Sequence, residues 1–182
     1  MRDLNHIIDH VKAYHESGET LDAARFLIRA FELESDNLQG LEFQKDVPKG
    51  QILMTAVGAV PGKQVVNIPD GVFRYNFELV LNLLMHEMLH VRQKSPANPV
   101  LDKNEREFQA YHEMLFHEIF PLVPDAPLTS RIEFAEKALE YYRRMGENSE
   151  LQLKYAAQKG EVEELLLNMR SMISKVNFDN KA

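Results

Sequence analysis

The residues best suited to chemistry are two histidines and a glutamate in the run His86-Glu87-Met88-Leu89-His90. In an α-helix, positions i and i+4 lie about one turn apart on the same face, so both imidazoles can aim at one point. Two neutral imidazoles with a carboxylate beside the first are the residue types of a hydrolytic zinc site. The spacing therefore predicts a metal site at His86 and His90, with Glu87 beside it.

The segment around this motif has the features of a long, buried helix. The run Phe77–Gln93 contains no glycine or proline and is apolar almost all round before the motif. Asn76 is a good N-cap, Glu78 suits the first turn, and Lys94-Ser95-Pro96 ends the helix. A helix that is apolar on all sides is a buried one. The motif is therefore expected where unpaired polar groups are costly.

Two alternatives to an active hydrolytic site also fit the motif. Histidines at this spacing can be ordinary buried residues whose ring nitrogens bond backbone carbonyls, and a helix of the hydrolytic type can have lost its activity. A chance match to the five-residue pattern is rare, on the order of a per cent or less per chain. We therefore expect a metal-binding helix.

A hydrolytic zinc site needs three protein ligands and one open position. The chain has no cysteine, so the third ligand must be His, Asp or Glu. A second long helix is predicted over roughly 102–119, with Asp102 as its N-cap. This helix offers seven candidates, which are Asp102, Glu105, Glu107, His112, Glu113, His117 and Glu118.

Geometry narrows these candidates only in part. His112 and His117 are an i, i+5 pair, about 140° apart around a helix, so they face different ways and are expected to be packing or surface residues. Glu105 and Glu107 flank the apolar centre of the helix on opposite sides. Helical periodicity does not decide between these two glutamates.

Part of the chain resembles a known family. Leu83 to Arg92 resembles the motif helix of the zincin metallopeptidases. Glu107-Phe108-Gln109-Ala110-Tyr111 is similar to the second helix of the gluzincin subgroup, where a Glu-aromatic-x-Ala-Asp run supplies the third ligand. The matched portion extends from Leu79 to Ile119 and does not include the remainder of the chain.

The resemblance implies both a ligand set and an activity. On this basis His86, His90 and Glu107 would bind Zn²⁺, and Glu87 would be the general base that acts on zinc-bound water. The expected function is a zinc-dependent metallopeptidase that hydrolyses peptide bonds of a peptide or protein substrate.

The chain departs from the gluzincin pattern at two positions. The family has an aspartate four residues after the ligand glutamate that orients a zinc-bound histidine, and this chain has Tyr111 there. Glu105 or Asp102 could take over that task. Arg92 stands where an uncharged residue is usual. The candidates for stabilising the transition state are Tyr111, His112, Arg131 and Tyr141.

Two other functions fit the same residues. One is a non-catalytic α-helical interaction protein that retains a zincin-like metal site, which the helical tail from Thr129 onward and the substitution at Tyr111 favour. The other is a zinc hydrolase acting on a non-peptide amide, which would use the same site and is not separable from a peptidase by sequence.

The remaining patterns predict an α+β fold that is mostly α. Apolar stripes indicate helices over 3–16 and roughly 21–34, which can form a small hairpin. Residues 51–60 and 63–69 read as strands joined by a Pro-Gly turn, so a β-hairpin or short sheet is expected before the motif helix. Its edge strand could hold an extended peptide by strand addition, or the hairpin could simply cover the helix.

A proline-rich break at 121–127 divides the chain. We expect residues 1–124 to form a zincin-like metallopeptidase domain that includes the N-terminal helical hairpin. Residues 125–182 are expected to form a C-terminal helical extension packed on it. Its helices are predicted from Thr129 or Ser130 to before Gly146, over about 149–158, and over about 161–175, with Gly160 as a stop.

Composition limits the partners and the compartment. The net charge is -7 and no block of Lys or Arg stands out, which argues against nucleic acid and anionic membranes as partners. The N-terminus lacks the apolar segment of a signal peptide, and no apolar run of residues is long enough to span a bilayer. The absence of cysteine fits a reducing compartment. A cytoplasmic protein is therefore expected. His6, His10 and His15 are expected to be solvated or packing residues, because no carboxylate-rich cluster surrounds them.

Overall fold

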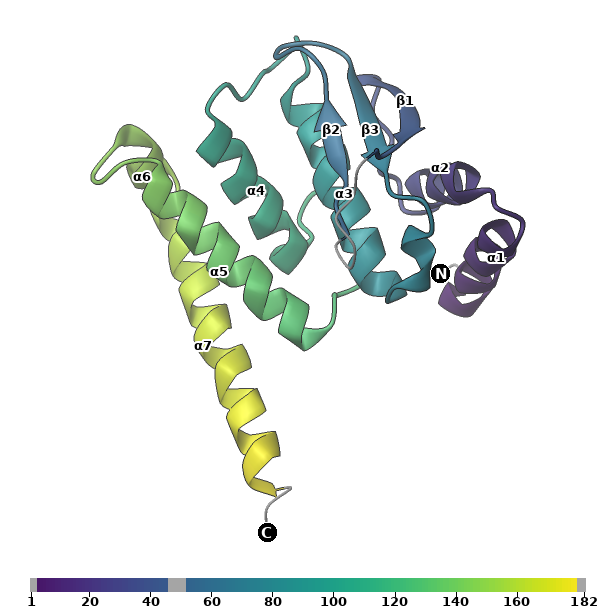
Figure 1. The fold of residues 1–182 in the computed structure, drawn as a ribbon. Helices are drawn as coiled ribbons and strands as arrows, with labels where there is room; N and C mark the ends of the chain where they lie inside the picture. The colour runs from purple at the N-terminus through teal and green to yellow at the C-terminus, as the bar shows by residue number, and fades with distance from the viewer. Residues whose placement is uncertain (1–2, 46–51, 180–182) are drawn as a thin grey trace. The chain divides into compact units, whose positions relative to one another are not determined.

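The computed structural model describes residues 3–45 and 52–179, which fold into two compact units (Figure 1). Helices dominate and there is a sheet of three strands, which confirms the predicted mostly α, α+β fold class. None of the helices in the described ranges is both long and apolar enough to cross a bilayer. The first unit comprises Met1–Leu101 and His117–Pro124, and the second comprises Asp102–Phe116 and Asp125–Ala182.

The first unit begins with the predicted helical hairpin of α1 (Leu4–Glu16) and α2 (Thr20–Ala30). The Asp3 carboxylate caps α1 by accepting from the backbone N–H of Asn5 at 3.0 Å. Gly18, at φ +75°, turns the chain in a conformation that a Cβ would disfavour. The two helices bury facing apolar residues, including Ile7, Val11, Ala24 and Leu27.

A three-stranded sheet follows, in the order β1-β3-β2. Its strands are β1 (Leu38–Phe43), β2 (Thr55–Val57) and β3 (Gln64–Ile68). The antiparallel pairing of β2 with β3 confirms the predicted hairpin, although β2 is shorter than the predicted strand, whose residue 51 lies outside the described ranges. Side chains along β3 alternate between buried and half-buried, so one face of this strand belongs to the core.

The parallel strand β1 was not predicted, because residues 37–50 look polar and mixed. Within β1 only Leu41 is buried, so the strand lacks the apolar alternation that would have revealed it. It is held by its backbone pairing with β3, a partner distant in sequence that local patterns do not reveal.

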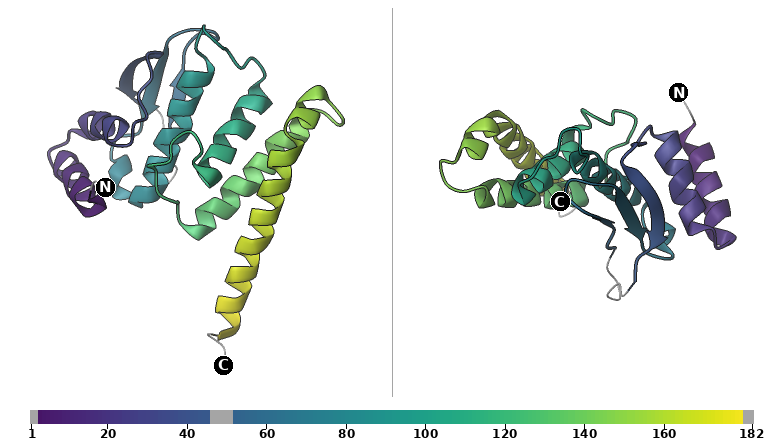
Figure 2. Two further views of the ribbon diagram at one scale, coloured as in Figure 1. Left: turned by 180° about the vertical axis from the view of Figure 1, so that it is seen from behind. Right: turned by 90° about the horizontal axis from the view of Figure 1, so that it is seen from above.

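Helix α3 (Phe77–Gln93) packs against β2 and β3 (Figures 1 and 2). The Asn76 side chain caps it by accepting from the backbone N–H of Leu79 at 2.8 Å, as predicted. Most of its side chains are buried, which confirms the predicted core helix. The fully buried ones include Leu81, Leu84, Met85 and Met88.

In its described residues, the second unit consists of helices joined by loops: α4 (Lys103–Phe116), α5 (Leu128–Arg144), α6 (Glu150–Lys154) and α7 (Ala156–Asp179). The Asp102 carboxylate accepts from the backbone N–H of Glu105 at 2.9 Å, so Asp102 caps α4 as predicted. α5 packs against both α4 and α7. The core between them includes Phe108, Met114, Ala135, Ala138, Val162 and Met169.

Two predicted helix boundaries in this region are wrong. α4 ends at Phe116 rather than near residue 119, and His117 takes the left-handed conformation at φ +48°. α7 runs through Gly160, where a stop was predicted. Glycine inside a helix costs only about 1 kcal/mol relative to alanine, and α7 buries Val162 and Met169 beyond Gly160.

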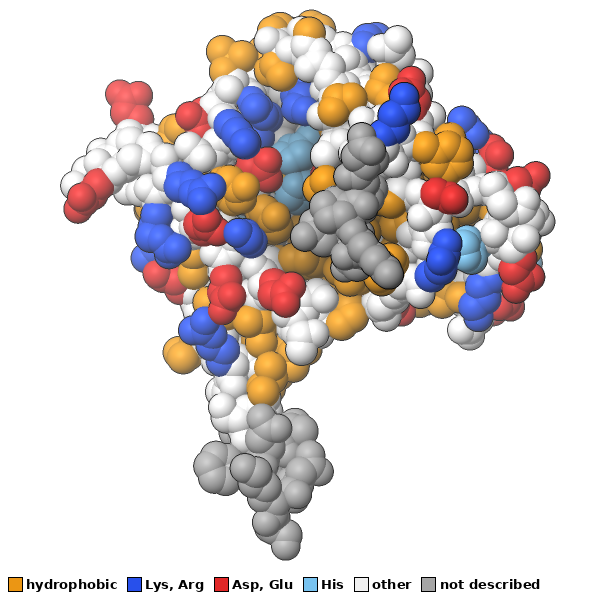
Figure 3. Space-filling model, in the orientation of Figure 1, with side chains coloured by type: hydrophobic (Ala, Val, Ile, Leu, Met, Phe, Trp, Pro, Cys, Tyr) orange, Lys and Arg blue, Asp and Glu red, His pale blue; other side chains and the backbone are white. Residues whose placement is uncertain are grey.

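The exposed faces of α5 and α7 carry charges of both signs, which lie interspersed in Figure 3. Arg170 of α7 pairs with Glu136 of α5 at 2.7 Å, and Lys137 pairs with Glu140 along α5 at 2.8 Å. These pairs are exposed to solvent, so each contributes little to stability.

Candidate metal centre

The three residues of the motif lie together on the buried side of α3. His86, Glu87 and His90 are 7%, 9% and 6% exposed. The two imidazole rings meet edge-on, with centroids 4.6 Å apart and planes at 87°. One ligand nitrogen from each ring lies within 4.8 Å of the other, close enough for both to contact one ion.

Among the described residues, those that could hold a metal ion include His86 and His90 of the first unit and Glu107 of the second. Glu107 lies on α4 and is half-buried. Imidazole and carboxylate are both ordinary ligands of Zn²⁺, so these side chains fit that ion by type.

The surroundings of Glu107 within the second unit are aromatic. Tyr111 and Tyr141 stack with ring centroids 5.8 Å apart and planes at 16°. Burial raises the pKa of the Tyr141 hydroxyl, and the negative charge of Glu107 raises it further. Tyr141 therefore lies within the electrostatic reach of the candidate third ligand.

The Glu87 carboxylate is tied to the neighbouring sheet. Its Oε2 accepts a hydrogen bond from the backbone N–H of Ala56 at 2.7 Å. The carbonyl oxygen of Ala56 accepts from the Lys94 ammonium at 2.5 Å. Ala56 is on β2, which is an edge strand, so a peptide added to this edge would compete with Glu87 and Lys94 at that residue.

His90 is bonded by a residue on its own helix. Its Nδ1 lies 2.7 Å from Oε1 of Gln93, and both side chains are buried. Gln93 is one turn beyond His90, where side chains on the same helical face meet.

The two other acidic candidates on α4 have different partners. Oε1 of Glu105 accepts from the Lys154 ammonium at 2.7 Å and from the Tyr155 hydroxyl at 2.8 Å. The Asp102 carboxylate caps the helix. Both residues therefore have structural contacts within the second unit.

His112 and His117 have separate environments, as their spacing predicts. His112 stacks on Phe116 with centroids 4.4 Å apart, and its Nε2 lies 3.4 Å from the Glu161 carboxylate. Nε2 of His117 lies 3.0 Å from Oδ1 of Asn82. These contacts agree with the expected packing roles.

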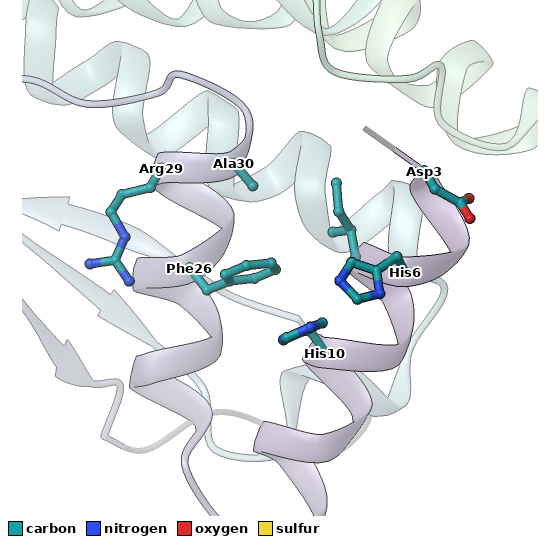
Figure 4. Close-up of a pocket in the computed structure, with 7 residues that line it drawn as sticks. Asp3, His6, His10, Phe26, Arg29 and Ala30 are labelled. Carbon is teal, nitrogen blue, oxygen red and sulfur yellow. The ribbon is translucent and has the colours of Figure 1, made fainter. Parts of the chain in front are cut away.

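A pocket of about 550 Å³ lies between α1 and α2 (Figure 4). His6 and His10 point toward Phe26 there, and the His10 ring stacks on Phe26 with centroids 5.4 Å apart. Both histidines are exposed. This arrangement agrees with the expectation that they are packing and solvated residues.

Sequence reasoning missed three residues that contact the motif or its partner, namely Ala56, Lys94 and Gln93. The spacing of Gln93 from His90 was a usable signal, because an acceptor at i+3 on the same face can reach the ring. The Ala56 contact joins segments distant in sequence, which no local pattern reveals.

In comparisons with known proteins, the chain matches no family model, no curated protein and no solved structure.

Proposed function

We propose that this protein is a zinc-dependent metallopeptidase with a zincin-like core, in which His86, His90 and Glu107 hold the zinc and Glu87 is the general base. The buried histidine pair of α3 carries the proposal, because two ligand nitrogens lie within 4.8 Å of each other beside a carboxylate. This combination of groups on one helix is typical of one class of hydrolytic zinc site. The proposed substrate is a peptide or protein.

The proposed chemistry assigns one task to each group. When bound, zinc lowers the pKa of water toward ~7 and polarises the amide carbonyl. The Glu87 carboxylate takes a proton from the water as its oxygen attacks the carbonyl carbon. Glu87 then gives this proton to the amide nitrogen, and the C–N bond breaks to leave a carboxylic acid and an amine. We assign the proton to Oε1, because Oε2 accepts the Ala56 N–H.

Elemental analysis of the purified protein tests the ligand set. Wild type is expected to hold about one zinc per chain, as three protein ligands define a single site, and Glu107→Gln is expected to lose most of it. Glu105→Gln is the matched control on the same helix, because Glu105 bonds Lys154 and Tyr155. Equal zinc in both variants would remove Glu107 from the ligand set. A wild type without zinc after incubation with Zn²⁺ would overturn the proposal.

The variant Glu87→Gln separates metal binding from catalysis. It is expected to keep its zinc, because Glu87 is not a ligand, and to lose about 10²–10⁴-fold in hydrolysis, the usual contribution of a general base. Cleavage of a peptide library, followed by mass spectrometry, measures this loss. Full activity in the variant would contradict the role of Glu87.

A second candidate function is a non-catalytic helical interaction protein that retains a zincin-like metal site. The bond from the Ala56 N–H to Glu87 favours it, because this contact gives the carboxylate a role in joining α3 to β2 that needs no catalysis. A zinc-loaded wild type that cleaves no peptide in the library would support this function over the first.

A further inference from the structure

We infer that Gln93 is the positioning residue for His90: its side-chain oxygen fixes the Nδ1–H tautomer of the imidazole and presents Nε2 to the metal. This inference rests on the proposed function for the identity of the ion. It goes further because it assigns the orientation of one ligand to Gln93, a residue to which the gluzincin resemblance gives no role.

The contact indicates which ring nitrogen carries the proton. Oε1 of Gln93 lies 2.7 Å from Nδ1 of His90, and an amide oxygen can only accept a hydrogen bond. With Oε1 of Gln93 facing the ring, Nδ1 donates and the neutral ring carries its lone pair on Nε2. A metal-binding histidine commonly donates its other N–H to a fixed acceptor, which sets both tautomer and ring orientation.

The backbone around Gln93 makes it a rigid support. Its carbonyl oxygen accepts from the backbone N–H of Val100 at 2.8 Å. The next residue, Lys94, closes the helix by donating its backbone N–H to the His90 carbonyl at 3.1 Å. Gln93 itself is only 5% exposed, so its side chain has little freedom to turn away from the ring.

The residues that could otherwise have oriented a ligand have other contacts. Tyr111 stands at the position of the family aspartate and stacks on Tyr141. Glu105 bonds Lys154 and Tyr155, and Asp102 caps α4. The bond to Gln93 is an observed contact that orients His90, and its acceptor is a neutral amide rather than a carboxylate.

A neutral acceptor has a consequence for affinity. A carboxylate beside the ring makes the imidazole a more basic ligand than an amide does. Replacing the amide by a carboxylate should therefore tighten zinc binding or leave it unchanged, whereas removing the acceptor should weaken it. A residue with a merely structural role would not give effects in these two directions.

The test measures zinc affinity by competition with a chromophoric chelator for wild type, Gln93→Met and Gln93→Glu. Gln93→Met is expected to bind zinc about 10- to 100-fold more weakly, the usual effect of losing such a partner. Gln93→Glu is expected to bind at least as tightly as wild type. Gln64→Met is the matched control, because Gln64 is a fully buried amide of the same unit that donates to backbone carbonyls instead. The control should keep wild-type affinity.

A second measurement needs neither metal nor a folded variant. Nitrogen-15 NMR of the metal-free wild type should show His90 protonated at Nδ1 and unprotonated at Nε2. A proton on Nε2 would overturn the inference. Two results of the affinity measurement would also overturn it: zinc affinity in Gln93→Met equal to that of wild type, or zinc binding in Gln93→Glu as weak as in Gln93→Met. These results leave the proposed function standing if wild type still binds one zinc. A wild type that binds none overturns both.

Discussion

At the scale of single residues, the buried face of α3 keeps its reactive side chains bonded. The Glu87 carboxylate accepts from Ala56, and the His90 ring is held by Gln93. An unpaired polar group in the interior costs free energy, so each of these bonds also limits the directions that its side chain can take. An almost wholly apolar helix can carry a reactive motif in an ordered form for this reason.

The motif was predictable because the i, i+4 relation is a property of the helix alone. The contact of Glu87 with Ala56 was not, since it depends on how β2 approaches α3. The same helical spacing places Gln93 near His90, but a single sequence does not show that a glutamine at this position supports a ligand. Sequence therefore locates the motif more readily than the residues that hold it.

The structural role of Glu87 can be tested apart from catalysis. Glu87→Leu leaves the Ala56 N–H without an acceptor, whereas Glu87→Gln keeps an acceptor oxygen in the same place. We expect Glu87→Leu to be less stable than Glu87→Gln by about 1–3 kcal/mol, the cost of an unsatisfied buried donor. Urea unfolding with a chelator present measures the difference without any metal contribution. Equal stability of the two variants would show that the Ala56 bond contributes nothing.

At the scale of elements, the helices and the hairpin were predictable where their signals are local. Asn76 and Asp102 cap α3 and α4 as predicted, because capping involves residues within one turn. β1 was not predicted, since it is held by its pairing with β3, which is distant in sequence. Gly160 was misread as a stop because the packing that carries α7 through it is tertiary.

The two glycines Gly160 and Gly18 allow a matched prediction. A Cβ at either position meets no atom within 4 Å, but Gly18 has φ +75° while Gly160 lies in a right-handed helix. Gly160→Ala is expected to raise the free energy of unfolding by about 0.5–1 kcal/mol. Gly18→Ala should lower it, because alanine is strained at positive φ. Thermal unfolding of both variants gives the two signs, and the same sign for both would contradict this account of α7.

At the scale of the whole molecule, the sequence predicts the fold class, and the chain is divided between two units. The chain enters the second unit at Asp102, returns to the first for His117–Pro124 and then leaves it again. The proline-rich break at 121–127 predicts an end to helical structure, but not which unit the flanking segments join. Which unit a segment joins depends on contacts that are distant in sequence.

Stability at alkaline pH depends on groups whose pKa values the fold raises, and the cluster of Glu105, Lys154 and Tyr155 contains two of them. Burial raises the pKa of Tyr155, and its hydrogen bond to Glu105 raises it further. The hydrogen bond to Glu105 also raises the pKa of Lys154, although its exposed ammonium is screened by solvent. Both groups hold their protons more tightly in the folded state. Their contribution to the free energy of unfolding is therefore complete below about pH 10, the ordinary pKa of tyrosine.

Stability should therefore fall as the pH rises from about 10 through the raised pKa values, because the unfolded chain then releases protons first. Tyr155→Phe removes one of the two titrating groups and is expected to flatten this decline, although it loses a hydrogen bond at neutral pH. Tyr75→Phe, at an exposed tyrosine, is the control and should leave the decline unchanged. Urea unfolding at intervals between pH 8 and pH 11 measures both slopes. An unchanged slope in Tyr155→Phe would show that Glu105 and its partners do not set the alkaline limit.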